Sequence, residues 1–240
     1  MKRVIPIVAF ALAACTSATD VNQRPAIASV ASDSLPVDAP FRDEIMRFAQ
    51  QDRDDSPPAC PVLFVGSSSI RLWSTLSEDM APLPVLNRGF GGSTIAQSNM
   101  YFDRIVAPYR PRAIVFYAGE NDLDGGTAPA VAAANFRHFM EIKRSKLGQT
   151  PVFYISAKPS KLRLTQFARQ TELNAAIRQL ASRSNDLTFI DVVSPMLQDG
   201  RPKDLYVEDG LHMNASGYAI WSDLVRAALA RKNIGRMSCR

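Results

Sequence analysis

An aspartate and a histidine three residues apart, Asp209 and His212, are the side chains in this sequence best placed for proton transfer. A carboxylate at this spacing on one loop can accept a hydrogen bond from the Nδ1–H of the imidazole, which leaves Nε2 free to take a proton. The pair therefore predicts a general base for nucleophilic catalysis. The second histidine of the chain, His138, lies inside a stretch of helical pattern without such a partner, so we expect it at the surface or in packing.

Three consecutive serines, Ser67, Ser68 and Ser69, follow the apolar run Val62–Val65 and precede a helical pattern. A hydroxyl at the start of a helix is a candidate nucleophile, because the first backbone amides of the helix stabilise a developing anion. The alternative is that these serines only cap the helix, as serine often does at this position. The sequence has no G-x-S-x-G motif, which argues against the ordinary α/β-hydrolase family.

Glycines and an amide side chain follow the next two apolar runs. The stretch from Asn87 to Thr94 contains Gly89, Gly91 and Gly92, and a glycine lets a backbone N–H point into a site without a side chain in the way. The stretch after the third run contains Asn121, whose amide can donate to an anionic oxygen. Taken singly, each stretch is equally compatible with a simple turn or a cap.

These groups can meet only if the runs before them are neighbouring strands of one sheet. The runs are short and almost uniformly apolar, which is typical of parallel strands covered on both faces. They are Val62–Val65, Val85–Asn87, Ala113–Ala118, Val152–Ser156 and Leu187–Val192, and helical patterns lie between them near 69–76, 94–107, 128–147, 165–184 and 214–232. This alternation predicts an α/β fold, a three-layer α/β/α sandwich with a doubly wound parallel sheet of about five strands. Reactive groups gather at the carboxyl edge of such a sheet.

One further helix is expected before the first strand. Pro40 suits a first helical turn, and Phe41, Ile45 and Phe48 then fall on one face of a helix that ends before Asp54. We expect this helix to pack on the outside of the sheet.

Four stretches therefore carry candidate residues; in chain order they contain Ser68, Gly92, Asn121 and the pair of Asp209 and His212. In this order they resemble the sequence blocks of the SGNH (GDSL-like) hydrolase superfamily of esterases and acylhydrolases, which is named after a Ser, a Gly, an Asn and a His in successive blocks. The resemblance extends from about Val62 to Trp221 and implies the SGNH, flavodoxin-like form of the sandwich. Position by position, it implies Ser68 as the nucleophile and Asp209 and His212 as its proton-handling partners. It also implies an oxyanion hole formed by the backbone N–H groups of Ser68 and Gly92 and by the side chain of Asn121.

The first block departs from the family pattern. The family commonly has Gly-Asp-Ser there, whereas this chain has Ser67 in the middle position. Alignment on Gly66 and the spacing from Gly66 to Trp73 still select Ser68, and Ser67 and Ser69 stay as alternatives.

The resemblance implies a carboxylic ester hydrolase that forms an acyl-enzyme on Ser68 and needs no metal and no organic cofactor. We expect a small-molecule or glycan ester with a short acyl or acetyl group, because the loops between Asn121 and Ser156 leave no obvious lid insertion. The loop Lys158–Arg163 is basic; it either favours an acidic substrate or is merely solvated, and we prefer the solvated interpretation. An acyltransferase of the same fold and a non-catalytic binding lipoprotein of the cell envelope are the alternative functions.

The start of the chain has the pattern of an export signal. Lys2 and Arg3 precede an apolar run, Val4–Ala14, that is too short to span a bilayer as a helix. Its end, Leu-Ala-Ala-Cys15, resembles a bacterial lipoprotein signal, in which the cysteine is lipidated; a plain cleaved signal peptide is the alternative. We therefore predict a signal peptide at 1–14, a flexible tether at 15–37 and the hydrolase domain at 38–240, with the protein lipid-anchored in the cell envelope. The residue after Cys15 is Thr16 rather than aspartate, which favours the outer membrane, facing the periplasm.

Composition and cysteines limit the remaining possibilities. The chain has 240 residues, of which 46% are hydrophobic and 21% charged, as is usual for one globular domain. The net charge of +5 is scattered, without an arginine-rich arm or a basic stripe, so we expect no nucleic acid partner.

Cys60 and Cys239 are expected at the same end of the sheet, and the periplasm permits them to pair; a disulfide and two free thiols are equally compatible with the sequence.

Overall fold

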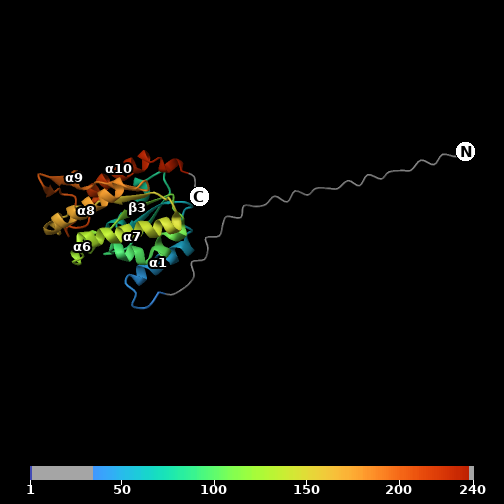
Figure 1. Cartoon of the computed structure of the whole chain (residues 1–240), viewed down its shortest axis with the longest axis horizontal. Coiled ribbons are helices and arrows are strands. Elements are labelled where there is room, and N and C mark those ends of the chain that lie inside the picture. The colour runs from blue at the N-terminus through green and yellow to red at the C-terminus, as the bar shows by residue number, and fades with distance from the viewer. Residues whose placement is uncertain (2–34, 238–240) are drawn as a thin grey trace.

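A five-stranded parallel sheet organises the residues that the computed structural model describes, Met1 and residues 35–237. Its strands are β1 (Val62–Gly66), β2 (Val85–Gly89), β3 (Ala113–Tyr117), β4 (Val152–Ile155) and β5 (Leu187–Ile190). Their order across the sheet is β2-β1-β3-β4-β5, so the chain starts inside the sheet, forms one edge and then returns past β1 to build the other side. The predicted doubly wound α/β fold is confirmed (Figure 1).

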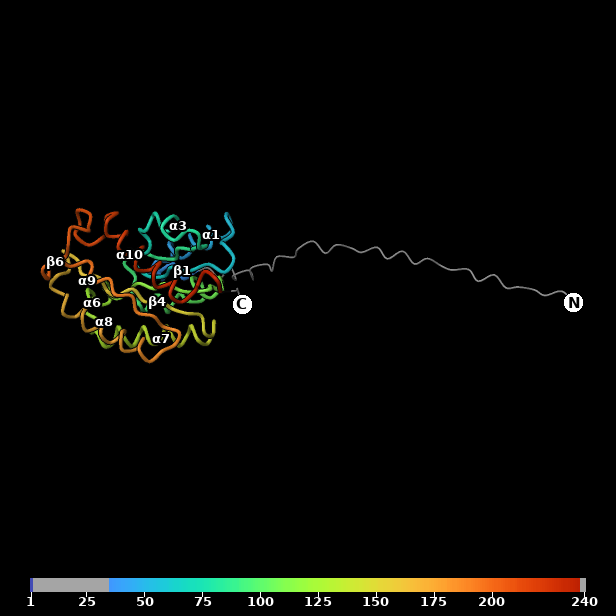
Figure 2. The backbone as a smooth tube through the Cα atoms, turned by 90° about the horizontal axis from the view of Figure 1, so that it is seen from above, coloured from blue at the N-terminus to red at the C-terminus, as the bar shows by residue number. Residues whose placement is uncertain are grey.

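Helices cover both faces of this sheet. One layer consists of α1 (Arg42–Asp54), α4 (Ile95–Met100), α5 (Phe102–Ile105), α7 (Pro129–Leu147) and α8 (Phe167–Ser182). The other consists of α2 (Ser68–Arg71), α3 (Leu76–Asp79), α9 (Val193–Met196) and α10 (Ala215–Arg231). Figure 2 shows β1 and β4 between α7 and α8 on one side and α3 and α10 on the other. Every residue of β1 and β3 is buried, which explains why these strands read as unbroken apolar runs.

Smaller elements complete the described fold. A short helix, α6 (Glu120–Asp124), follows β3, and a two-stranded hairpin forms from β6 (Leu197–Gln198) and β7 (Arg201–Pro202). Three 3₁₀ turns lie at Ala107–Tyr109, Leu164–Gln166 and Ile234–Arg236. The sequence patterns did not predict these pieces as separate elements, because each is shorter than the window over which periodicity becomes visible.

Three predicted helices differ from the observed ones. The first begins at Arg42 rather than at Pro40, because Phe41 takes a left-handed backbone conformation with φ of 57°. The stretch near 69–76 is divided into α2 and α3, because the indole of Trp73 turns into the core and donates a hydrogen bond to Asp79 at 2.6 Å. The stretch near 94–107 is likewise interrupted at Tyr101, between α4 and α5.

Some predictions concern residues outside the described part. Cys15 and the signal peptide lie there, as does Cys239. Cys60 takes part in a disulfide bond, and its pairing with Cys239 stays a prediction. None of the described helices is long and apolar enough to cross a membrane.

A buried ion pair attaches α7 to the start of β5. The ammonium group of Lys143, whose side chain is fully buried, donates to Oδ2 of Asp186 at 2.6 Å. Arg144 donates to both oxygens of the same carboxylate, at 2.9 and 2.7 Å. Hydrogen bonding from Arg144, followed by that from Lys143, holds the pKa of Asp186 far below its usual value.

We expect Asp186→Ala to lower the free energy of unfolding by roughly 3–5 kcal/mol, because it leaves the ammonium of Lys143 buried without its counter-charge. Urea unfolding near neutral pH measures the loss. The control is Asp103→Ala, which removes the exposed ion pair with Lys146 and should cost less than about 1 kcal/mol. Equal losses of unfolding free energy in the two variants would contradict the stabilising role of the buried ion pair between Lys143 and Asp186.

Candidate active site

Residues far apart in the chain form a hydrogen-bonded series at the carboxyl edge of the sheet. Nε2 of His212 lies 2.9 Å from Oγ of Ser68, and Nδ1 of the same ring lies 2.5 Å from Oδ2 of Asp209. The structure thus brings the predicted aspartate, histidine and serine together in the order that proton transfer to and from a serine hydroxyl requires.

The loop of the aspartate holds its carboxylate in the ionised form. Oδ1 of Asp209 accepts hydrogen bonds from the backbone N–H groups of Leu211, at 2.8 Å, and of His212, at 2.9 Å. Desolvation acts to raise the pKa of Asp209, but these bonds and the contact with the imidazole outweigh it and lower the pKa to about 2. At neutral pH the carboxylate therefore accepts from Nδ1–H, and Nε2 faces Ser68 as a proton acceptor.

Ser68 owes its position to the glycine that ends β1. Gly66 has a φ of +138°, and a Cβ atom there would lie 1.8 Å from the carbonyl oxygen of Tyr117. This close approach lets the N–H of Ser67 donate to that oxygen at 2.9 Å, and α2 then begins at Ser68. The side chains of Ser67 and Ser69 are buried, and of the three serines only Ser68 contacts His212 among the described hydrogen bonds.

The residues predicted for an oxyanion hole come together through Ser93. Asn121, near the start of α6, donates from Nδ2 to the carbonyl oxygen of Ser93 at 3.0 Å. The hydroxyl of Ser93 donates in turn to the carbonyl oxygen of Gly66, the residue two before Ser68, at 3.2 Å. Gly92 has a φ of +74°, with open space where a Cβ atom would lie.

Two charged residues that the sequence did not single out individually contact this part of the site. Arg163 donates from Nη1 to Oδ1 of Asn121 at 3.0 Å, and its side chain is only 12% exposed. On the other side, Glu44 of α1 accepts a hydrogen bond from the N–H of Gly91, beside Gly92, at 3.1 Å.

The basic loop Lys158–Arg163 therefore departs from the solvated interpretation at both ends. Lys158 is buried and donates to Glu120 at 2.9 Å, and Arg163 contacts Asn121. Lys161 does fit the expectation, since it is about half exposed and pairs with Asp204 at the surface. No local pattern in the sequence predicts these contacts, because the partners of Lys158 and Arg163 lie about 40 residues away along the chain.

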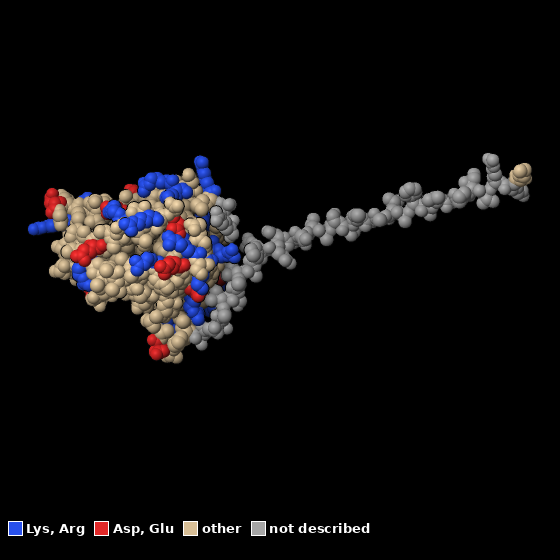
Figure 3. All heavy atoms as spheres, in the orientation of Figure 1, with Lys and Arg blue, Asp and Glu red and all other residues tan. Residues whose placement is uncertain are grey.

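The remaining polar candidates lie apart from this cluster. His138 is on the exposed face of α7, as expected, with a contact to Glu141. Within residues 35–237, no three His, Cys, Asp or Glu side chains are grouped so that they could hold a metal ion. Basic and acidic side chains are interspersed over the face shown in Figure 3.

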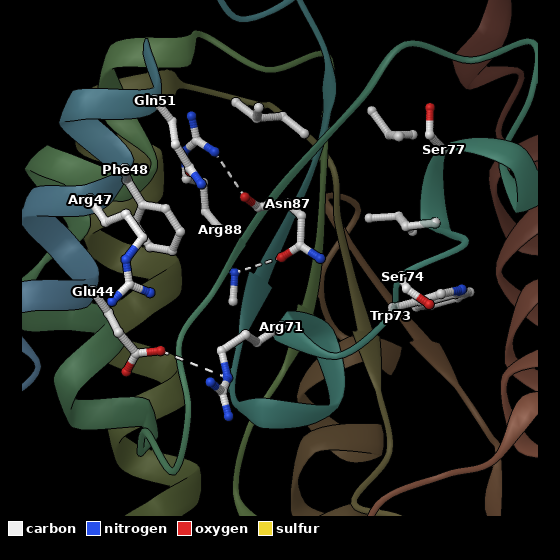
Figure 4. A pocket seen from close by; sticks show the side chains of 14 residues that line it. Glu44, Arg47, Phe48, Gln51, Arg71, Trp73, Ser74, Ser77, Asn87 and Arg88 are labelled. Atoms are coloured by element: carbon white, nitrogen blue, oxygen red, sulfur yellow. Dashed lines mark hydrogen bonds and ion pairs between the residues drawn. The ribbon is translucent and has the colours of Figure 1, made fainter. Parts of the chain in front are cut away.

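A cavity of about 470 Å³ lies beside the site, between α1, the edge strand β2 and the α2–α3 segment. Figure 4 shows Glu44 of α1 pointing across this cavity toward Arg71, the last residue of α2. Oε1 of Glu44 lies 3.7 Å from Nε of Arg71. Ser68, His212 and Asp209 are not among the residues that line it. The cavity therefore lies outside the hydrogen-bonded series of Ser68, His212 and Asp209.

Fold and site together define an α/β protein with a serine–histidine–aspartate triad at the carboxyl edge of a parallel sheet. The model of the GDSL-like lipase/acylhydrolase family matches residues 64–220, which is more than half of the chain. The chain belongs to the GDSL-like lipase/acylhydrolase family. This agrees with the resemblance found in the sequence.

Solved structures of related fold support the same architecture. A GDSL-like lipase from Bacteroides thetaiotaomicron is 24% identical, with a TM-score of 0.67 over 78% of this chain and 98% of that one. A carbohydrate esterase family 3 protein from Talaromyces cellulolyticus is 15% identical, with a TM-score of 0.60 over 74% and 99%. A lipase/acylhydrolase from Enterococcus faecalis is 20% identical, with a TM-score of 0.57 over 75% and 98%. No curated protein matches the chain significantly.

A buried carboxyl group next to Asn121 attaches α6 to the start of α4. Both side-chain oxygens of Asp122 accept from the N–H of Ile95, at 3.2 and 3.1 Å, and the residue is 2% exposed. Burial raises the pKa of Asp122 from 3.8 to about 6. Because the folded state then binds a proton more tightly than the unfolded chain, this group makes the free energy of unfolding fall as pH rises from about 4 to about 6.

We expect Asp122→Asn to remove that part of the pH dependence, because the amide still accepts from Ile95 and cannot ionise. Urea unfolding at about pH 4 and about pH 7 should show a smaller decline in the variant, by up to roughly 3 kcal/mol. An unchanged decline would show that another group causes it.

Proposed function

We propose that the protein is a serine esterase that hydrolyses carboxylic esters through an acyl-enzyme on Ser68. The observation that carries the proposal is the contact of 2.9 Å between Nε2 of His212 and Oγ of Ser68, with Asp209 on the opposite ring nitrogen. Membership of an acylhydrolase family supports the same reaction class.

In the first half-reaction, Oγ of Ser68 attacks the ester carbonyl carbon while Nε2 of His212 takes the hydroxyl proton. The tetrahedral intermediate collapses, and the leaving alcohol receives that proton from His212. In the second half-reaction, water attacks the acyl-serine and gives a proton to His212. The imidazolium returns that proton to Oγ of Ser68 as the acid leaves. Asp209, held ionised by its loop, stabilises the imidazolium in both halves.

The negative oxygen of both intermediates requires hydrogen-bond donors. The N–H groups of Ser68 and Gly92 and the Nδ2 group of Asn121 take this role in the proposal. Losing one such donor typically slows turnover by about 10²–10³.

The substrate we propose is a small-molecule or glycan ester with a short acyl or acetyl group. Two exposed apolar side chains, Leu162 and Val207, belong to segments that bind the loop of His212: the N–H of Leu162 donates to Gly210, and that of Val207 donates to His212. Exposed apolar surface on segments bound to the histidine loop suits a short acyl chain or the apolar part of an alcohol. A carbohydrate esterase is among the proteins of similar fold.

We further propose that the mature chain is anchored to the outer membrane through a lipidated Cys15 and faces the periplasm. The support is the sequence Leu-Ala-Ala-Cys15 behind a short apolar run. Labelling of cells with a radioactive fatty acid should mark the wild-type chain and leave Cys15→Ala unmarked. Equal labelling of both chains would refute the anchor.

We expect Ser68→Ala and His212→Ala each to lower the hydrolysis of p-nitrophenyl acetate by at least about 10⁴-fold, because either change removes the activated nucleophile. The matched control is His138→Ala, which removes the other histidine and should leave turnover unchanged. A series of p-nitrophenyl esters of increasing chain length should show the highest kcat/KM for the shortest acyl groups.

Two results would redirect the proposal. Full activity in Ser68→Ala would refute the acyl-enzyme mechanism. Transfer of the acyl group to an added alcohol in preference to water would identify an acyltransferase.

A further inference from the structure

A positively charged side chain lies behind the amide of Asn121. Nη1 of Arg163 donates to Oδ1 of Asn121 at 3.0 Å, and Nη2 donates to Asp124, in the same helix α6, at 3.0 Å. The opposite end of the amide is also bound, since Nδ2 of Asn121 donates to the carbonyl oxygen of Ser93 at 3.0 Å.

These two contacts select one orientation of the amide. The two ends of an asparagine side chain have nearly the same shape, but only Nδ2 can donate a hydrogen bond. A guanidinium has donors and no acceptor, so Arg163 pairs only with Oδ1; a carbonyl oxygen only accepts, so Ser93 pairs only with Nδ2. A rotated amide would place two donors against each other on one side and two acceptors on the other. The second hydrogen of Nδ2 stays available for the oxygen of a substrate.

The charge of Arg163 also strengthens this donor. A cation bound to the carbonyl end of an amide withdraws electron density from the nitrogen, and hydrogen bonds in such a series reinforce one another. Asp124 balances the charge of the guanidinium, and the side chain of Arg163 is only 12% exposed. The guanidinium is therefore not free to bind an anionic substrate itself.

We propose that Arg163 is a positioning residue for the oxyanion hole, which fixes and polarises the amide of Asn121. This inference rests on the proposed esterase function. Arg163 touches no reacting atom in that mechanism and acts through Asn121 alone.

Two backbone hydrogen bonds hold the loop that carries Arg163 in place. The N–H of the preceding residue, Leu162, donates to the carbonyl oxygen of Gly210 in the histidine loop at 3.0 Å. The N–H of Arg163 itself donates to Oγ of the buried Ser160 at 3.3 Å. Since its backbone is fixed in this way, the guanidinium can impose an orientation on Asn121.

The test compares kcat and KM for p-nitrophenyl acetate in variants of the full-length protein. We expect Arg163→Ala to lower kcat by about 10- to 100-fold with KM changed less than about 3-fold, because the effect falls on the negatively charged intermediate. Arg163→Lys should recover part of the loss, since an ammonium group can still donate to Oδ1. If Arg163→Ala does not fold, Arg163→Gln serves in its place.

A double-variant cycle decides whether the arginine acts through the amide. In an Asn121→Ala background, Arg163→Ala should lower kcat by less than about 3-fold further, because the group it orients is already absent. If the two losses multiply instead, Arg163 does not act through Asn121 and the inference is wrong.

Arg169→Ala is the matched control for a merely structural effect. Arg169 binds the carbonyl oxygens of Leu123 and Thr127 at 2.9 Å each, so it supports α6 and the residues after it without touching Asn121. Its loss should lower the free energy of unfolding and leave kcat within about 3-fold. An equal loss of kcat in Arg169→Ala and Arg163→Ala would overturn the positioning role. Hydrolysis that requires Ser68 but is unaffected by Arg163→Ala would refute this inference alone, whereas hydrolysis independent of Ser68 would refute the esterase mechanism.

Discussion

The pairing of β1 with β2 on one side and β3 on the other is the constraint on which the site depends. In the parallel register, Gly66 lies opposite Gly89 of β2 and Tyr117 of β3, so the three strands end in one row. Each following loop must then start from the same edge. For this reason residues separated by up to 144 positions meet there: Ser68 follows β1, Gly92 follows β2, Asn121 follows β3, Arg163 follows β4, and Asp209 and His212 follow β5.

Two glycines in that row allow α2 to lie directly over the strand ends. A Cβ atom on Gly66 would meet the backbone of Tyr117, and one on Gly89 would lie 2.4 Å from the backbone nitrogen of Arg71. A larger residue at Gly89 would push α2 away from the sheet, and one at Gly66 would force the end of β1, from which α2 starts, away from β3. Because α2 is a single turn that begins at Ser68, such a displacement would move the hydroxyl away from His212. The hydrogen bond between serine and histidine is thus a consequence of close backbone packing.

The sequence was sufficient to predict the strands of the sheet. It was not sufficient to predict the short helices or the charged residues that bind the site from distant parts of the chain. The five strands start at the predicted residues, because buried parallel strands are continuous apolar runs. The division between α2 and α3 follows instead from the packing of Trp73 against Phe64 and Trp221, which local periodicity does not encode. The same distinction holds in the site. Asp209 and His212 are neighbours in the chain and could be paired by spacing, whereas Glu44 and Arg163 bind partners 47 and 42 residues away.

The two halves of the site differ in their access to water, and the proposed mechanism needs that difference. On the side of proton transfer, the side chain of Asp209 is 44% exposed and that of His212 is 26% exposed, so solvent reaches the groups that the mechanism assigns to proton transfer. On the side of Asn121, Arg163 is only 12% exposed and the neighbouring pair of Glu120 and Lys158 is buried, although Asp124, the partner of Arg163, is 46% exposed. Hydrogen-bond donors stabilise a developing anion most strongly where solvent is excluded and where they need not reorient. Charges paired with one another can support such donors without attracting counter-ions into the site. An exposed half for the proposed proton transfer and a largely covered, hydrogen-bonded half for the proposed oxyanion hole can therefore coexist at one sheet edge.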